Sequence, residues 1–296
     1  MLSTLRSATE VASFVPDEAS AVKVLGEEQI ICLTRNCKKC GNEMTLRKRK
    51  ETFEFRCRID KSKDCSTEGL RKRTWFEKTR IPLKSAITVI VLWINKYTSQ
   101  QIVNETGLSP STVVDFRNYL RNACSAIAEK YPKIGGPGKI VQADECCVHA
   151  RKYGRGEKER ALTWILGAVE HGTRNVSVKI IPTRSRNVIM PLLRKWIDPQ
   201  SEVHTDSHKS YLSCGMYFKR HLKVNHSTEF KNVLDDGTEV HTNSIESLWK
   251  RLKEPLKQGN GTSEDLLPSY LDELVVRERE GDAFAATIWE YIKHFN

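Results

Sequence analysis

Residues 139–148 have the sequence KIVQADECCV, a short β-branched run broken by polar residues. The pattern predicts a strand, and similar runs follow at 161–170 (ALTWILGAVE) and 176–181 (VSVKII), each bounded by turn residues. Next come an expected amphipathic helix over 187–197 (NVIMPLLRKWI) and a short strand over 201–206 (SEVHTD). Strands followed by a single helical crossover predict an α/β or α+β core.

The composition indicates a globular protein with an excess of positive charge. The chain has 296 residues, of which 39% are hydrophobic and 29% are charged. This length accommodates one large domain and one or two small ones. Lys and Arg number 48 against 37 Asp and Glu, which gives a net charge of +11. Such an excess fits a polyanionic partner, because cations that neutralise phosphates release condensed counterions, although an ordinary basic protein would also show it.

The chain lacks the sequence signals of membrane insertion and secretion. No stretch approaches 18 consecutive apolar residues, so no membrane span is expected. The first twenty residues lack the continuous apolar core of a secretory signal. The nine cysteines are therefore expected to be reduced thiols or metal ligands rather than disulfides.

A cysteine cluster within residues 29–80 predicts a zinc ribbon. Cys37 and Cys40 form a Cys-x2-Cys knuckle that can place two thiolates on one ion, and Cys57 and Cys65 would supply the second pair. A small, cysteine-dense segment has little core of its own, so structural Zn²⁺ is expected to stabilise it.

Two alternatives to this ligand set stay open. Cys32 competes as a ligand, because the second pair is spaced more widely than usual, and all of these cysteines could instead be free thiols. The stretch 44–57 (MTLRKRKETFEFRC) alternates in the manner of the hairpin that a ribbon requires.

Residues 81–132 are expected to be helical and to resemble a helix-turn-helix. Within 97–120 (YTSQQIVNETGLSPSTVVDFRNYL), Ser99 can cap a short helix and Gly107 marks a turn before a second helix. Four apolar positions of this second helix are expected in the core: Val113, Val114, Phe116 and Leu120. If the second helix contacts DNA, its exposed candidates are Arg117, Asn118 and Arg121. The alternative is a helical hairpin that only links the ribbon to the core.

The remaining boundaries follow from changes of pattern along the chain. Residues 1–28 form an N-terminal segment without a strong pattern, and KIGGPGK at 133–139 is the clearest linker. The core is expected over 140–280, followed by a C-terminal helix over 281–296.

Three acids occupy positions that fit a metal site. Asp144 lies late in the first core strand, Asp206 ends the later strand, and Glu246 opens a helix. A ribonuclease-H-like core places acids on its first strand, at the end of its fourth strand and on a helix against the sheet. Together they would hold two divalent ions about 3.5–4 Å apart. Oxygen ligands favour Mg²⁺ or Mn²⁺.

Two neighbours of these acids have alternative roles. Glu145 competes with Asp144, but adjacent strand residues point to opposite faces, so Glu145 is expected to aim away from the ions. Lys250 follows Glu246 by four residues on the same helix face, where it could contact DNA phosphate or pair with Glu246.

Four stretches of this sequence resemble the Merlin superfamily of DNA transposons and the ISXO-type insertion-sequence transposases of bacteria. They are ADECCVHARKYGRG (143–156), VHTDSHKSY (203–211), FKRHLKVNHSTEF (218–230) and VHTNSIESLWKRLK (240–253). The resemblance covers about 140–279 and implies an α/β, ribonuclease-H-like DDE core. By this resemblance, the triad of metal-binding acids would be Asp144, Asp206 and Glu246. Some bacterial relatives carry Asn where this chain has Glu246.

The family resemblance also implies a function and partners. It predicts cut-and-paste transposition, in which two Mg²⁺ or Mn²⁺ ions support DNA strand cleavage and strand transfer. The partners would be double-stranded DNA, namely terminal inverted repeats and target DNA, and further copies of the chain bound on DNA. A basic hairpin at 151–160 is well placed to bind DNA through Arg151, Lys152 and Arg155, although it could be a solvated turn.

Two other functions compete with an active transposase. One is a host-adopted DNA-binding protein that no longer cuts. The other is a ribonuclease or Holliday-junction nuclease on the same fold, which would not need both a zinc ribbon and a helix-turn-helix. The expected location is the nucleus in a eukaryote, which we favour, and the cytoplasm otherwise, with no membrane partner.

Overall fold

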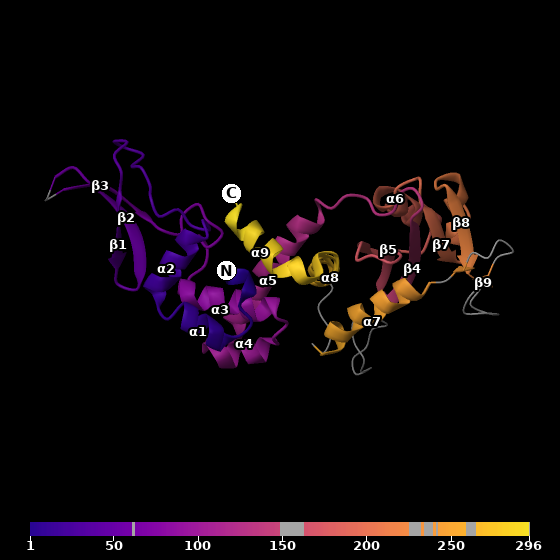
Figure 1. The fold of residues 1–296 in the computed structure, drawn as a ribbon, viewed down its shortest axis with the longest axis horizontal. Coiled ribbons are helices and arrows are strands. Elements are labelled where there is room, and N and C mark those ends of the chain that lie inside the picture. Colours follow the sequence, from indigo (N-terminus) through magenta and orange to yellow (C-terminus); the bar gives the residue numbers. More distant parts are fainter. Residues whose placement is uncertain are drawn as a thin grey trace. The chain divides into compact units, whose positions relative to one another are not determined.

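The computed structural model describes residues 1–60, 63–148, 163–224, 232–233, 239–240, 242–258 and 265–295. The chain divides into two compact units, and Figure 1 labels their elements. The first unit comprises Met1–Ala123 and Asp282–Asn296, and the second comprises Cys124–Gly281. No helix among the described residues is both long enough and apolar enough to cross a membrane.

The N-terminal segment is helical, although its sequence shows no strong pattern. After a 3-10 turn, η1 (Leu2–Thr4), come α1 (Ala8–Phe14) and α2 (Glu18–Glu27). Ser7 and Asp17 cap the two helices through their side chains. Both helices contact α3 (Leu83–Ile94), an almost fully buried helix, and the Glu18 carboxylate accepts hydrogen bonds from the backbone at its start. The segment therefore belongs to the helical core of the first unit.

The cysteine-rich region forms a three-stranded antiparallel sheet. Its strands are β1 (Thr45–Arg49), β2 (Thr52–Arg58) and β3 (Asp64–Gly69), in the order β1-β2-β3. The hairpin expected within 44–57 is confirmed. Phe55 is fully buried beneath the guanidinium of Arg35, which lies 4.6 Å from the ring centroid.

The helices α4 (Ser99–Thr106) and α5 (Pro110–Ala128) flank a left-handed Gly107, as the sequence predicts. The cap of α4 is Thr98, in a capping box with Gln101, rather than Ser99. Val114 is 43% exposed, so its expected place in the core is wrong, whereas the other three apolar positions are buried. The C-terminal helix α9 (Phe284–Lys293) belongs to the same unit, with the ring of Phe284 against that of Trp93.

The second unit is built on a five-stranded mixed sheet with the order β6-β5-β4-β7-β8. The first three strands in the chain are antiparallel: β4 (Ile140–Val148), β5 (Thr163–Glu170) and β6 (Val176–Ile181). The other two are parallel to β4: β7 (Glu202–Asp206) and β8 (Arg220–Val224). This order, with the first strand in the centre, is the ribonuclease-H-like topology, so the expected α/β fold class is confirmed.

Helices cover both faces of this sheet. On one face α6 (Arg186–Trp196) packs against β4, β5 and β7, and Ile189, Met190 and Leu193 join the core. On the other face lie α7 (Asn243–Gln258) and α8 (Leu267–Glu280). The smaller elements are β9 (Asn232–Val233), β10 (Glu239–Val240), η2 (Lys209–Tyr211), η3 (Cys214–Met216) and η4 (Gly281–Ala283).

The segment 133–139 is packed onto this sheet rather than being a free linker. The Ile134 side chain is buried, and the backbone N–H of Gly135 donates to Glu170 Oε2 at 3.0 Å. Gly135 has φ +87°, and a Cβ there would lie 2.1 Å from the Ser201 hydroxyl. Both the left-handed backbone and the close approach explain this glycine.

His221 makes the stability of β8 sensitive to acid. Its Nε2 lies 2.9 Å from the Thr205 hydroxyl, and burial, Lys223 and His204 lower its pKa from 6.5 to about 4. The unfolded histidine therefore takes up a proton at a higher pH than the folded one. Stability contributed by neutral His221 should be lost as the pH falls from about 6.5 towards about 4.

Urea unfolding of the wild type and of His221→Gln at about pH 7.5 and about pH 5 measures this effect. The wild type should lose more unfolding free energy on acidification than the variant does. Equal losses in the two proteins would show that His221 is not the acid-sensitive group.

Candidate active site and metal sites

Three carboxylates meet where β7 ends beside the middle of β4. Asp144 and Glu145 lie on β4, and Asp206 is the last residue of the neighbouring β7. Each offers one ligand oxygen, and these oxygens lie within 4.8 Å of one another. Two of the three predicted acids, Asp144 and Asp206, are thus brought together.

Glu145 also lies in this group, so the expectation that its side chain aims away from the metal site is wrong. The two neighbours do differ in direction: Asp144 Oδ2 accepts a hydrogen bond from Trp249 on α7, whereas Glu145 Oε2 pairs with Arg184, which precedes α6. The two helices cover opposite faces of the sheet. One carboxylate oxygen of each residue nevertheless lies within 4.8 Å of one of Asp206.

The electrostatics of this group disfavour the accumulation of negative charge. The pKa of Glu145 is raised from 4.5 to about 7, because burial and the nearby charges of Asp144 and Asp206 together outweigh the lowering effect of Arg184. Burial is also the largest cause that raises the pKa of Tyr211 well above 10, followed by the charges of the same three carboxylates. A cation would relieve this concentration of charge.

Arg184 supplies a positive charge beside the acids. Its Nη2 lies 3.3 Å from Glu145 Oε2 and 4.0 Å from Asp206 Oδ2. The guanidinium carbon lies 4.7 Å above the ring centroid of Trp164, and the Arg184 carbonyl accepts a hydrogen bond from the Ser210 hydroxyl. Sequence reasoning missed Arg184, because an isolated arginine in a loop has no distinguishing pattern.

Glu246, the third predicted acid, lies in the first turn of α7 and outside the group of three. Its carboxylate accepts a hydrogen bond of 3.4 Å from the Thr242 hydroxyl. The helix is anchored to β4, because Gln142 Oε1 accepts hydrogen bonds from the backbone N–H groups of Ser244 and Ile245. Lys250, one turn further along α7, is exposed.

Of the predicted DNA contacts on α5, Arg121 is buried and Arg117 is partly buried. Arg121 is only 2% exposed and donates to Asn118 Oδ1, so its assignment as a DNA contact is wrong. Arg117 is partly buried and donates to the carbonyl of Tyr97 and the hydroxyl of Ser99. The cause is the helical period, which places both arginines beside the buried stripe of α5. Three other predicted contacts lie outside the described residues: Arg151, Lys152 and Arg155.

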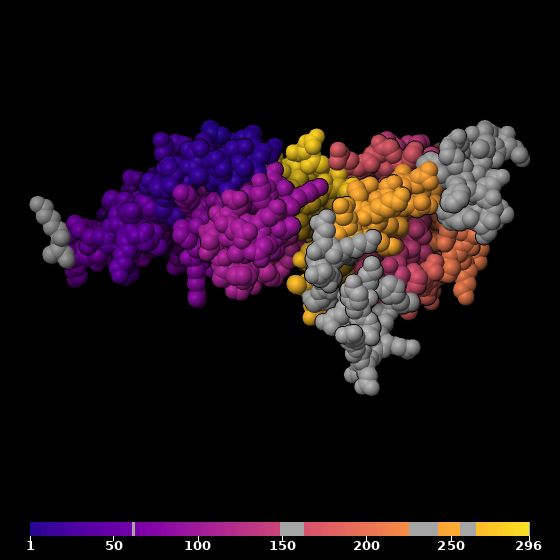
Figure 2. Space-filling model, turned by 90° about the horizontal axis from the view of Figure 1, so that it is seen from below, coloured from indigo at the N-terminus to yellow at the C-terminus, as the bar shows by residue number. Residues whose placement is uncertain are grey.

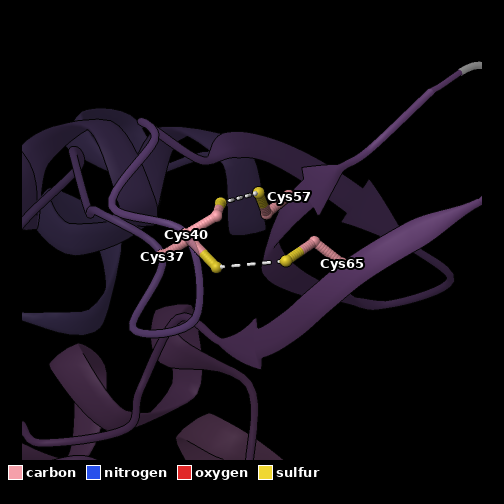
Figure 3. A group of neighbouring side chains, drawn as sticks. All are labelled: Cys37, Cys40, Cys57 and Cys65. Carbon is pink, nitrogen blue, oxygen red and sulfur yellow. Dashed lines mark hydrogen bonds between the residues drawn. The ribbon is translucent and has the colours of Figure 1, made fainter.

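Four cysteines converge in the first unit, as Figure 3 shows. Cys37 and Cys40 lie in the knuckle, Cys57 on β2 and Cys65 on β3, and their sulfurs are within 4.8 Å of one another. The Sγ atoms of Cys37 and Cys65 are 3.7 Å apart, and those of Cys40 and Cys57 are 3.4 Å apart. Cys32 is outside this group, exposed, and bonds to the Thr34 carbonyl.

The surroundings of the four thiols favour a thiolate at Cys37. Hydrogen bonds from the Ser66 hydroxyl and from the backbone of Cys40 and Lys39 lower the Cys37 pKa from 9.0 to about 6. The Cys57 pKa is raised to about 12 by its hydrogen bond with Cys40 and by burial. Four convergent sulfurs form a donor set that suits a tetrahedral Zn²⁺ ion.

Comparisons with known proteins find a family match within the second unit. Residues 136–279 match the family described as the ISXO2-like transposase domain. An uncharacterized transposase-like protein of Haemophilus influenzae (strain ATCC 51907 / DSM 11121 / KW20 / Rd) is 28% identical over 94 residues, which is 32% of this chain and 72% of that protein.

Solved structures similar to this chain include an intasome and a strand transfer complex. The simian T-cell lymphotropic virus intasome in complex with PP2A regulatory subunit B56 gamma is 12% identical, with a TM-score of 0.32, over 64% of this chain and 67% of that one. The Mos1 strand transfer complex is 13% identical, with a TM-score of 0.30, over 67% and 70%. The family match supports the ISXO-type part of the resemblance, because all four motifs lie within residues 136–279, which match the ISXO2-like transposase domain.

Proposed function

We propose that this chain is a divalent-metal-dependent transposase that cleaves DNA at the ends of its element and joins them to target DNA. The observation that carries the proposal is the meeting of Asp144 and Asp206, from adjacent strands, within 4.8 Å inside a transposase-family domain. Carboxylates so close together are costly unless a cation compensates their charge.

The residues at this site fit Mg²⁺ or Mn²⁺. Carboxylate oxygens are the ligands that these ions prefer, and Asp144 and Asp206 each place one within 4.8 Å of the other. Asp144 and Asp206 would hold the ions, and Glu246 would complete the triad from α7. When bound, two such ions activate an attacking water or 3′-hydroxyl and stabilise the leaving oxygen.

The chain's own residues orient this chemistry. Gln142 holds the start of α7 against β4, which keeps Glu246 on the helix next to Asp144. Arg184 offers a guanidinium beside Asp206, which could contact a phosphate of DNA bound at this site. Tyr211 and the Glu145 carboxyl are buried and exclude water from the side of the sheet that carries α6.

Double-stranded DNA is the proposed partner, with the chain acting as a homo-oligomer on it. The net charge of +11 and the exposed Lys250 on α7 support this partner. Part of α7 is seen in orange in the space-filling view of Figure 2. The four-cysteine group supports structural Zn²⁺ in the ribbon. The ribbon and α3–α5 would recognise the element ends, and the second unit would carry the chemistry.

The proposal is tested with the purified full-length chain and labelled duplexes that carry the ends of its own element. Mg²⁺ should produce strand cleavage at the element boundary, and a chelator should stop it. Binding that weakens steeply with salt but is never followed by cleavage would instead support the second candidate, a host-adopted DNA-binding protein that no longer cuts. The intact pair of Asp144 and Asp206 favours the active enzyme.

A further inference from the structure

Trp249 makes a specific bond to one of the proposed metal-binding acids. It lies on the sheet-facing side of α7, is 6% exposed, and its indole N–H donates to Asp144 Oδ2 at 3.0 Å. The indole nitrogen can only donate, and a bond from it to an ionised carboxylate is charge-assisted. This contact therefore sets the orientation of the Asp144 carboxylate about its side-chain torsions.

Gly167 makes room for this bond. It lies on β5 directly opposite Asp144, and a Cβ there would stand 2.5 Å from Trp249 Cη2 and 2.9 Å from Cζ2. The backbone of Gly167 does not have the positive φ that favours glycine. The space taken by the indole, rather than the conformation of β5, thus explains a glycine at this position.

A second contact fixes the position of α7 along the same strand. Gln142 lies two residues before Asp144, so its side chain is on the same face of β4, and it accepts the backbone N–H groups of Ser244 and Ile245. Ser244 and Ile245 precede Glu246 in the sequence, whereas Trp249 follows it and donates its hydrogen bond to Asp144 on β4. Glu246 is therefore held between two attachments of its helix to the strand that carries Asp144.

We propose that Trp249 is a positioning residue of the metal site, and that Gly167 is its structural complement. The Trp249 N–H orients the carboxylate of Asp144 for ion binding. The same hydrogen bond holds α7 against β4 and so fixes the position of Glu246 relative to Asp144. Trp249 itself contacts neither ion nor DNA. This inference rests on the proposed function, because it requires Asp144 to bind a divalent ion.

The test is a calorimetric titration of the full-length, zinc-loaded protein with Mn²⁺. Trp249→Phe keeps an aromatic ring and removes the N–H, and Gly167→Ala displaces the indole. Each should weaken Mn²⁺ binding by about tenfold or more, the usual effect of losing a partner that orients a metal ligand.

Two controls separate positioning from packing. Trp289 is also 6% exposed, and its indole N–H has no hydrogen-bond partner among the described residues, so Trp289→Phe alters only packing. Gly69 is a strand glycine with no atom within 4 Å of an added Cβ, so Gly69→Ala matches Gly167→Ala without the clash. Both controls should bind Mn²⁺ as the wild type does, and thermal unfolding of all four variants records the packing cost.

The outcomes distinguish this inference from the function on which it rests. If Trp249→Phe and Gly167→Ala lose thermal stability but bind Mn²⁺ like the controls, Trp249 is a packing residue and the inference is overturned. If Trp249→Phe does not fold, Gly167→Ala decides alone. If the wild type binds no Mn²⁺, or Asp144→Asn binds it as tightly as the wild type, the proposed metal site fails and the inference fails with it.

Discussion

Asp144→Asn and Asp206→Asn should each abolish Mg²⁺-dependent strand cleavage and leave DNA binding nearly intact. Each change is close to isosteric, so the strand ends and their packing should survive. Each removes one negative charge from a site in which the two acids lie within 4.8 Å. Stabilisation of the transition state by the ions amounts to several kcal/mol, and a loss of about 4 kcal/mol is roughly a 10³-fold loss of rate.

The same assay decides which residue is the third acid. Glu246→Gln should be as inactive as Asp144→Asn, because Glu246 is proposed to complete the triad from α7. Glu145→Gln should retain measurable activity, because Glu145 Oε2 is already paired with Arg184 and its side chain is fully buried. It should nevertheless cut less well than the wild type, since that pairing holds Arg184 beside Asp206.

Glu202→Gln is the matched control for these variants. It changes a carboxylate at the opposite end of β7 from Asp206, where Glu202 pairs with Arg220 and His204. It should cut DNA like the wild type. If Glu145→Gln were inactive and Glu246→Gln active, the third acid would be Glu145. Normal cleavage by both Asp144→Asn and Asp206→Asn would refute the proposed site altogether.

Cys57→Ser should remove zinc from the ribbon and unfold it. Cys57 is fully enclosed at β2, and its sulfur lies 3.4 Å from that of Cys40 within the four-cysteine group. Structural Zn²⁺ contributes about 10–16 kcal/mol to the folding of small zinc domains, far more than a three-stranded ribbon gains from its own core. Elemental analysis should fall from about one zinc per chain towards none.

Cys32→Ser is the internal comparison for this result. Cys32 is exposed and lies outside the group of four, so this variant should keep its zinc and its resistance to proteolysis. Proteolysis of Cys57→Ser should cut within β1–β3 while the sheet of the second unit stays intact, because the two units are separately compact. If Cys32→Ser lost its zinc while Cys57→Ser kept it, Cys32 rather than Cys57 would be the fourth zinc ligand.

The sequence predicted the core strands well because their residues carry a strong local signal. β4, β5 and β6 are apolar, β-branched-rich runs between turn residues, β7 is a short strand that contains Val203 and Thr205, and all four form where expected. β8 was missed because three of its five residues are basic or imidazole side chains, RHLKV, which is possible for a strand at the sheet edge. Its pairing with β7 is a long-range contact that no local pattern reveals.

Side-chain environments proved harder to predict than the elements. Arg121 was expected at the surface as a DNA contact, but it is buried beside Leu120 on the inner stripe of α5. Charge is a good guide to exposure only on average, and a paired or stacked arginine can be enclosed. Similarly, the period of two correctly separates the faces of Asp144 and Glu145, but it does not show that both carboxylates lie close to Asp206.

The contacts between β4 and α7 could not be found from the sequence. Trp249 is part of the stretch HTNSIESLW, yet its spacing from Glu246 indicates only a shared helix. Its bond to Asp144 depends on the packing of a helix against a strand about a hundred residues earlier, as does the need for glycine at 167. Only the folded arrangement brings these residues together.

The central claim is that Asp144 and Asp206 jointly bind divalent ions, and the most direct test locates those ions. Anomalous diffraction from crystals of the wild type grown with Mn²⁺ should show metal within about 2.0–2.3 Å of a carboxylate oxygen of both Asp144 and Asp206. The third protein ligand should be Glu246 rather than Glu145. Crystals that show no metal at these two aspartates, with Mn²⁺ bound only elsewhere, would contradict the account.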